Sequence, residues 1–330
     1  MTAFSKSIPT YGDVEAAANR ITPLINRTPV LTSQNLNRMT NAELFFKGEN
    51  FQKAGAFKFR GACNAICSFS AKELRHGVAT HSSGNHGQAV ALAAKLRDIP
   101  AYIIIPKNAP AVKINAVKGY GAHITFCEPT LQAREESLAH ILEETKAQFI
   151  HPSNDPKVIA GQGTAALELL ADIPDLDNII VPVGGGGLLS GTALAVRGGA
   201  GDVSVFGAEP LGADDAFRSL QAGRLITPEN PHSVADGLLT SLGGSDISRN
   251  SEMRSPDHDG ERSYDYRCDA TCLGASENRH RTIGGSAGRR ITGECGPVRR
   301  DTHGDNNLRR ECGSRIPSMD STKRFARSPG

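Results

Sequence analysis

The sequence predicts an α/β protein built around largely parallel sheets. Helix-like and strand-like segments alternate from Asp13 to Phe206, and this order is typical of α/β layers. Two glycine-rich turns, Ser82–Gly87 and Gly184–Leu188, each follow a predicted strand and precede a predicted helix. With 330 residues the chain is long enough for two ordinary domains, each with its own core.

The individual elements are predicted from hydrophobic periodicity and cap residues. Predicted helices begin at Asp13 and after Leu188, and the others cover Lys58–Ser70, Gly87–Leu96, Val112–Lys118, Leu131–Lys146 and Gly163–Leu170. Predicted strands cover Leu44–Lys47, Val78–His81, Ala101–Pro106, His123–Phe126, Asn178–Val183 and Val203–Ala208. No internal repeat interrupts this order.

Composition narrows the classes of partner and compartment. A formal net charge of +2 supplies no argument for a nucleic-acid or membrane partner, and no apolar run approaches the roughly 18 residues of a membrane span. Seven cysteines are an odd number, and Met1–Pro9 lacks a secretory signal pattern, so we expect a cytoplasmic protein with reduced thiols. Cys63 and Cys67 fit structural thiols on one helix.

The turn Ser82-Ser83-Gly84-Asn85-His86-Gly87 has the features of an anion site. It lies between the predicted strand Val78–His81 and a helix, so backbone N–H groups and a helix N-terminus point toward the strand's carboxyl end.

The second turn, Gly184-Gly185-Gly186-Gly187-Leu188, follows an apolar strand and precedes a helix of small residues. Four consecutive glycines let a backbone close around a phosphate, although a flexible turn is the alternative interpretation. The turn lacks both the Gly-Lys-Ser/Thr ending of a Walker loop and the Gly-x-Gly-x-x-Gly spacing of dinucleotide-binding folds.

Lys58 lies between Phe57 and Phe59 at a predicted helix start. Partial desolvation and a helix N-terminus both lower the pKa of an amine and favour the neutral nucleophile that forms Schiff bases. The alternative is a solvent-facing lysine whose stem covers apolar surface.

Taken together, these motifs resemble the fold-type II pyridoxal-phosphate enzymes, in particular the serine racemase and threonine/serine dehydratase group. The resemblance runs from about Ile8 to Gly243. It includes Phe57-Lys58-Phe59-Arg60-Gly61, both glycine-rich turns and Gly207-Ala208-Glu209-Pro210 in the group's order and spacing.

The resemblance implies the tryptophan synthase β-like fold, with two three-layer α/β/α domains and the cofactor between them. Residues 1–76 and 151–243 correspond to a large cofactor domain, and residues 77–150 to a small domain. It also implies a small amino-acid substrate and a homodimer.

By the same resemblance, Lys58 forms the Schiff base with pyridoxal phosphate and is the base on one face of the substrate α-carbon, while Ser83 stands on the other face. Further site residues follow from the resemblance. The cofactor contacts are Phe57, Asn85, Gly184, Gly185, Gly186, Gly187 and Leu188, and the substrate-carboxylate contacts are Ser82, Ser83, Asn85, His86 and Gly87.

A divalent-cation site is implied at Glu209, Asp215 and the carbonyl oxygen of Ala213, a set suited to Mg²⁺ or Ca²⁺. Without the resemblance, the more common interpretation of Glu209, Asp214 and Asp215 is a solvent-exposed acidic loop that binds no metal. ATP regulates serine racemases, so ATP is a candidate effector, but no phosphate motif here accounts for it.

The implied chemistry starts with removal of the α-proton and then divides. Reprotonation from the Ser83 face inverts the amino acid, whereas loss of the β-hydroxyl produces a keto acid and ammonia. Elimination of threo-3-hydroxyaspartate, or an inactive homologue with an Arg-rich tail, are the alternatives. Phe59 and His86 argue against cysteine synthase, which prefers Asp and Thr at these positions.

The resemblance ends at Gly243. From Gly244 onward the chain has one Lys, fifteen Arg and ten residues of the Ile, Leu, Val, Phe and Met kinds, as in a disordered or out-of-frame segment. With a suitable choice of synonymous codons, the codons for Gly244 onward read one nucleotide later can encode Asp-Leu-Thr-Phe-Pro, and later stretches can encode Glu-Pro-Ser and Ser-Gly-Gly-Asn. We infer a one-nucleotide insertion at Gly243-Gly244, so that residues 244–330 do not fold natively.

Overall fold

The computed structural model describes residues 8–82, 84–199 and 203–243. The predictions for Ser83 and residues 244–330 lie outside this part of the chain. Its α-helices are α1 Tyr11–Ile21, α2 Gln34–Thr40, α3 Lys58–Cys67, α4 Asn85–Leu96, α5 Ala111–Gly119, α6 Leu131–Thr145, α7 Pro156–Asp172, α8 Gly187–Gly199 and α9 Asp215–Ala222. The strands are β1 Val30–Thr32, β2 Phe45–Lys47, β3 Val78–His81, β4 Ala101–Pro106, β5 His123–Cys127, β6 Gln148–Phe149, β7 Asn178–Pro182 and β8 Ser204–Ala208. Short 3₁₀ helices are η1 Glu49–Phe51, η2 Lys53–Gly55 and η3 Asp236–Leu238.

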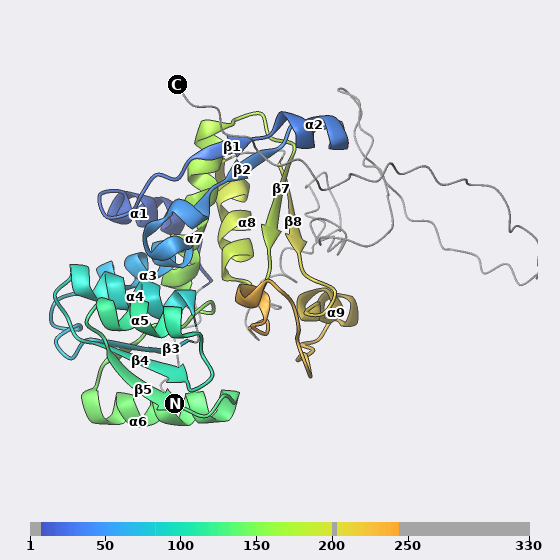
Figure 1. Cartoon of the computed structure of the whole chain (residues 1–330). Helices are drawn as coiled ribbons and strands as arrows, with labels where there is room; N and C mark the ends of the chain where they lie inside the picture. Colours follow the sequence, from blue (N-terminus) through green and yellow to red (C-terminus); the bar gives the residue numbers. More distant parts are fainter. Residues whose placement is uncertain (1–7, 83, 200–202, 244–330) are drawn as a thin grey trace, which may run out of the picture. The chain divides into compact units, whose positions relative to one another are not determined.

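A four-stranded parallel sheet with the order β5-β4-β3-β6 lies in the middle of the chain. Helices α4 and α5 cover one face of this sheet and α6 covers the other (Figure 1). Because β3 and β6 are parallel neighbours, the segments that follow them emerge at the same edge. The glycine-rich turn Ser82–Gly87 follows β3, and residues 150–154 follow β6.

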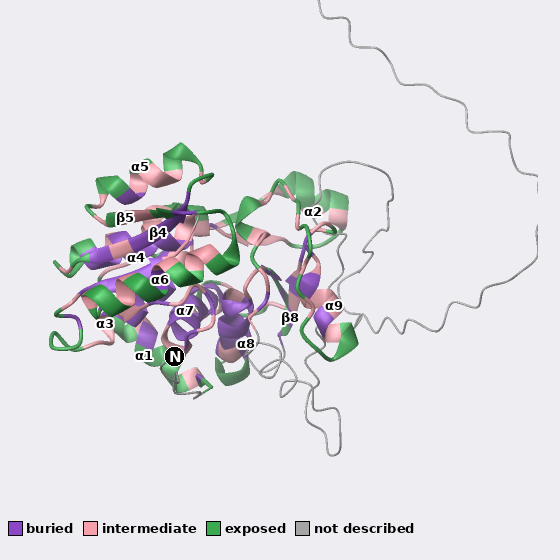
Figure 2. Ribbon diagram, turned by 90° about the horizontal axis from the view of Figure 1, so that it is seen from below, coloured by how far each residue is buried: buried purple, intermediate pink, exposed green. Residues whose placement is uncertain are grey.

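A second parallel pair, β7 and β8, packs against α8. Helix α7 contacts α1, α3 and α8 and joins them into a helical layer, and the ribbons of α7 and α8 are largely purple, that is buried, in Figure 2. The antiparallel pair β1 and β2 completes the sheets of the described residues. These parallel sheets with helical layers confirm the α/β prediction.

Helix α7 begins at Pro156, earlier than the predicted start at Gly163. Asp155 caps it, because its side chain accepts hydrogen bonds from the backbone N–H groups of Lys157 and Val158. Glycine lowers the helix propensity of a segment, but the glycines of α7 let this helix pack closely against its neighbours. A Cβ on Gly161 would lie 2.7 Å from the Arg60 carbonyl oxygen in α3, and one on Gly163 would lie 2.6 Å from the Gly191 carbonyl oxygen in α8.

Four short elements, β1, β6, α2 and α9, were not predicted, because each has too few residues for a clear hydrophobic period. The predicted structural thiols lie on α3, where Cys63 is buried and Cys67 is half-buried. Among the helices of the described residues, none has the length and apolar character of a bilayer-spanning segment.

Candidate active site

Lys58 is the first residue of α3, as predicted. Its Nζ donates a hydrogen bond to the carbonyl oxygen of Pro152 at 2.8 Å and lies 5.3 Å from the centre of the Phe57 ring. The side chain is therefore half-buried and directed at the segment that follows β6, rather than at bulk solvent.

Arg60, two residues after Lys58, fixes the position of the start of α3. Its guanidinium is fully buried and forms paired hydrogen bonds of 2.8–2.9 Å with the carboxylates of Glu49 and Glu168. Burial opposes the charge on Glu168, but hydrogen bonds from Arg60 and Lys47 bring the pKa of this carboxyl below its ordinary value. Removal of one partner would leave an uncompensated buried charge, so the network holds α3 in place.

The predicted anion turn forms the N-terminus of α4. Ser82 Oγ accepts a hydrogen bond from the Gly84 N–H at 3.1 Å, and Asn85 is the first helical residue. His86 is 3% exposed, and its Nε2 lies 3.1 Å from the carbonyl oxygen of Ile150. Its Nδ1 has no partner among the described residues. Burial, together with the charge of Lys58, keeps the pKa of His86 well below its ordinary value, so the imidazole is neutral.

The glycine loop, residues 184–187, connects β7 to α8, whose first turn starts at Gly187. A Cβ on Gly185 would lie 2.5 Å from Ser153 Oγ, and one on Gly187 would lie 3.0 Å from the Ser153 carbonyl oxygen. Side chains at these positions would therefore collide with the neighbouring segment. The free N–H groups at the start of α8 and this bare backbone form a cradle of the kind that binds phosphate.

The segment Ile150–Ser153 brings the three sequence motifs together. Its Ile150 carbonyl contacts His86, its Pro152 carbonyl contacts Lys58, and its Ser153 packs against the glycine loop. Sequence reasoning missed this segment, because β6 is two residues long. The sequence feature that could have revealed this segment is the polar stretch His151-Pro152-Ser153-Asn154 between two apolar segments.

The structure thus groups most of the predicted cofactor and substrate residues. Phe57 precedes α3, Gly87 lies in the first turn of α4, and Leu188 lies in the first turn of α8. The position of Ser83 is outside the described residues.

The predicted cation residues lie apart from Lys58, around the start of α9. Glu209 accepts hydrogen bonds from the N–H groups of Ala216 and Phe217, and Asp215 accepts one from the Leu242 N–H at 2.8 Å. Burial, and then the charges of Asp215 and Asp214, raise the pKa of Glu209 to about 7. Two buried carboxylates that repel one another in this way favour a cation between them.

Ala213 is also buried beside these carboxylates. Across residues 8–82, 84–199 and 203–243, no three His, Cys, Asp or Glu side chains form a metal-binding group. A cation here would rely on Glu209, Asp215 and backbone oxygen.

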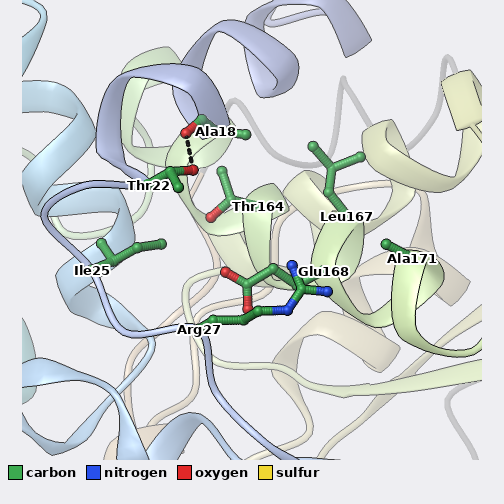
Figure 3. A pocket seen from close by; sticks show the side chains of 8 residues that line it. All are labelled: Ala18, Thr22, Ile25, Arg27, Thr164, Leu167, Glu168 and Ala171. Atoms are coloured by element: carbon green, nitrogen blue, oxygen red, sulfur yellow. Dashed lines mark hydrogen bonds between the residues drawn. The ribbon is translucent and has the colours of Figure 1, made fainter.

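A separate cavity of about 220 Å³ lies between α1 and α7. Figure 3 shows the side chains that line it, with Thr22 Oγ1 donating a hydrogen bond to the Ala18 carbonyl. None of the predicted site residues lines this cavity, and its Glu168 is already paired with Arg60. It therefore does not compete with the Lys58 site as the place of chemistry.

Comparisons with known proteins identify the family of this chain. Residues 21–262 match the family described as pyridoxal-phosphate dependent enzyme. The chain is 51% identical over 236 residues to a serine racemase of Dictyostelium discoideum, which covers 71% of this chain and 73% of that protein. It is also 51% identical over 235 residues to a beta-hydroxyaspartate dehydratase of Paracoccus denitrificans, covering 71% of this chain and 75% of that protein.

Among solved structures, maize serine racemase superimposes with a TM-score of 0.72 at 47% identity, covering 74% of this chain and 75% of the maize chain. The fold and the match over most of the described residues agree. This chain belongs to the family of pyridoxal-phosphate dependent enzymes and has the fold-type II architecture.

Proposed function

We propose that this chain catalyses β-elimination or racemisation of serine, threonine or a related small hydroxy-amino acid. The observation that carries the proposal is the segment Ile150–Ser153, which contacts Lys58, the anion turn and the glycine loop at once. The names of the relatives, serine racemase and beta-hydroxyaspartate dehydratase, support the same substrate class.

The residues of the site fit pyridoxal phosphate. The glycine loop is a cradle that Cβ atoms would fill, and the start of α8 supplies N–H groups for a phosphate. The Lys58 amine and this cradle both contact the Ile150–Ser153 segment. When bound, the cofactor stabilises the negative charge that develops at the substrate α-carbon. We propose that Phe57, Asn85 and Leu188 complete its contacts.

The protein's own groups bind substrate and move protons. In this proposal the Lys58 amine removes the α-proton from one face, and the Ser83 hydroxyl delivers or accepts a proton at the other. Ser82, Asn85, His86 and Gly87 receive the substrate carboxylate at the N-terminus of α4, where backbone N–H groups favour an anion.

The first experiment tests Lys58. Purified full chain is mixed with pyridoxal phosphate and reduced with borohydride, and the modified peptide is identified by mass spectrometry. We expect the label on Lys58, no label in Lys58→Ala, and an unchanged label in the exposed control Lys72→Ala. Retention of the label in Lys58→Ala would assign the attachment to another lysine.

Substrate choice is tested with L-serine, L-threonine and threo-3-hydroxyaspartate. Keto acid and the mirror-image amino acid are measured in the same reaction. The hydroxyaspartate activity is the alternative, because one of the 51% identical relatives carries that name. Preferential turnover of hydroxyaspartate would favour it. Ser83→Ala is expected to lose racemisation more completely than elimination, and equal loss of both would remove Ser83 from its role.

We further propose that Glu209, Asp215 and the Ala213 carbonyl hold Mg²⁺ or Ca²⁺. The support is the pair of buried carboxylates with raised pKa values. The expected result is a higher Tm on addition of either ion, lost in Glu209→Gln and kept in Asp175→Asn, whose carboxylate lies elsewhere. An equal shift in both variants would contradict the site.

The remaining sequence expectations stay proposals. We propose a large domain of residues 1–76 and 151–243 and a small one of 77–150, which contains all four strands of the β5-β4-β3-β6 sheet. A homodimer, a cytoplasmic location and ATP as an effector are further predictions, as is the shifted reading frame of residues 244–330. The proposed frameshift is supported by the change of composition at Gly244, while the family match runs from residue 21 to residue 262.

A further inference from the structure

His151 occupies an unusual place next to the proposed active site. It follows β6 directly, and its ring Nδ1 accepts hydrogen bonds from the backbone N–H groups of Ser153 at 3.2 Å and Asn154 at 2.8 Å. Side-chain oxygens of Asn and Asp usually perform this task in tight turns. Here an imidazole nitrogen closes the turn His151–Asn154.

Two contacts made by this turn are to residues of the proposed site. Its Pro152 carbonyl oxygen accepts the hydrogen bond from Lys58 Nζ at 2.8 Å. Its Ser153 fills the space beside Gly185 and Gly187, where any Cβ would collide. A turn with a different backbone path would move the lysine's partner and one wall of the phosphate cradle together.

The ring itself is held from outside the turn. It packs edge-on against Phe149 with the ring centres 5.6 Å apart. His81 also stacks against Phe149, with the ring centres 5.9 Å apart. Burial, and then the charges of His81 and Lys58, lower the pKa of His151 to about 4. Nδ1 is therefore an acceptor across the neutral pH range.

We propose that His151 is a positioning residue that sets the direction of the Lys58 amine by holding the Pro152 carbonyl toward it. This inference rests on the proposed function, in which Lys58 carries the cofactor and moves the α-proton. The hydrogen bonds of His151 are to the backbone of the turn, so we place its effect on Lys58 in the turn.

The test measures the reactivity of Lys58 in the cofactor-free full chain. Competitive acetylation with trace acetic anhydride is read peptide by peptide, with exposed Lys72 as the internal reference. The hydrogen bond to the Pro152 carbonyl engages and shields the Lys58 amine, so we expect Lys58 to react slowly in the unmodified protein. In His151→Leu we expect Lys58 to react about threefold to tenfold faster relative to Lys72, as expected for the loss of one hydrogen bond.

Two further variants distinguish a specific effect of His151 on Lys58 from a general loss of structure. In His151→Asn the amide oxygen stands the same number of bonds from the backbone as Nδ1, so it closes the turn and slow labelling of Lys58 returns. In His81→Leu the aromatic stack is shortened but the turn keeps its acceptor, so Lys58 stays slow. Native far-UV circular dichroism and cofactor fluorescence titration accompany each variant, and weaker cofactor binding is expected for His151→Leu alone.

Unchanged Lys58 labelling in a folded His151→Leu overturns the proposal. If that variant fails to fold, fast labelling in a folded His151→Asn overturns it instead, because the restored acceptor should hold the lysine. Acetylation of Lys58 requires no catalytic turnover, so it tests the role of His151 separately from the proposed function. Failure of the proposed function would instead appear as cofactor that does not attach to Lys58.

Discussion

Lys113 of α5 and Asp236 of η3 form an ion pair between segments that are 123 positions apart in the chain. The Lys113 side chain lies over the anion turn, since a Cβ on Gly84 would be 3.1 Å from its Nζ. The residues after Asp236 lie over the glycine loop, where a Cβ on Gly184 would be 3.4 Å from the Gly237 carbonyl. One ion pair thus joins the segments next to both turns.

Reversing the charge of one member of this pair should impair substrate binding, and reversing the charge of the other member as well should restore it. Lys113→Glu is expected to raise the KM for the amino-acid substrate about fivefold, a size set by partly exposed pairs worth up to about 1 kcal/mol. The double variant Lys113→Glu/Asp236→Lys should recover most of this loss. Steady-state kinetics at low and high salt provide the measurement. The exposed pair Lys107 and Glu128 is the matched control, and its reversal should change little.

Gly185→Ala is expected to weaken cofactor binding by at least tenfold. The added Cβ would lie 2.5 Å from Ser153 Oγ, so either the glycine loop or the Ile150–Ser153 segment must shift. Fluorescence titration with pyridoxal phosphate provides the affinity. Gly119→Ala is the control, because no atom lies within 4 Å of a Cβ there. Equal affinities in the two variants would show that the loop is not a close-fitting cradle.

The buried histidines predict acid sensitivity. Burial lowers the pKa values of His81 and His151 to about 4, whereas an unfolded histidine titrates near 6.5. Between these values the unfolded chain binds more protons than the folded chain, so the free energy of unfolding should fall as the pH falls from about 6.5 to about 4.

The raised pKa of Glu209 acts in the opposite direction over part of this range, so the measurement compares two proteins. Urea midpoints of the unmodified chain and His151→Asn should converge as the pH falls, because the variant lacks the His151 titration and keeps that of Glu209. The change in the difference is expected to be on the order of 2 kcal/mol. A constant difference from pH 7 to pH 4 would contradict the buried neutral state of His151.

The shifted reading frame predicts particular codons. For a one-nucleotide shift to encode Ile-Ile-Ile-Ser-Gly-Gly-Asn here, Asp305 must be encoded by GAT and Asn306 by AAT to give the first isoleucines, and Arg309 and Arg310 by codons that end in GG to give the two glycines. Sequencing of the gene decides this directly, and GAC or AAC at the first two positions would refute it. Deletion of one G at Gly243-Gly244 should then increase the yield of soluble protein with bound cofactor.

Several features of the site could be predicted from the sequence, because they are local. A glycine-rich turn after an apolar strand implies an anion site wherever the sheet lies, and a lysine at a helix start next to phenylalanine implies a desolvated amine. The structure has Lys58 at the start of α3 and the glycine loop before α8, where the sequence predicted them, and the roles of both stay predictions.

What only the tertiary structure decided is how these local features meet. The two-residue strand β6 has no periodic pattern of its own, and its position beside β3 follows from pairing across almost seventy residues of chain. That pairing delivers Ile150, Pro152 and Ser153 to His86, Lys58 and the glycine loop. Contacts of this kind arise from carbonyl directions and side-chain volumes in the packed state, and no single stretch of sequence encodes them.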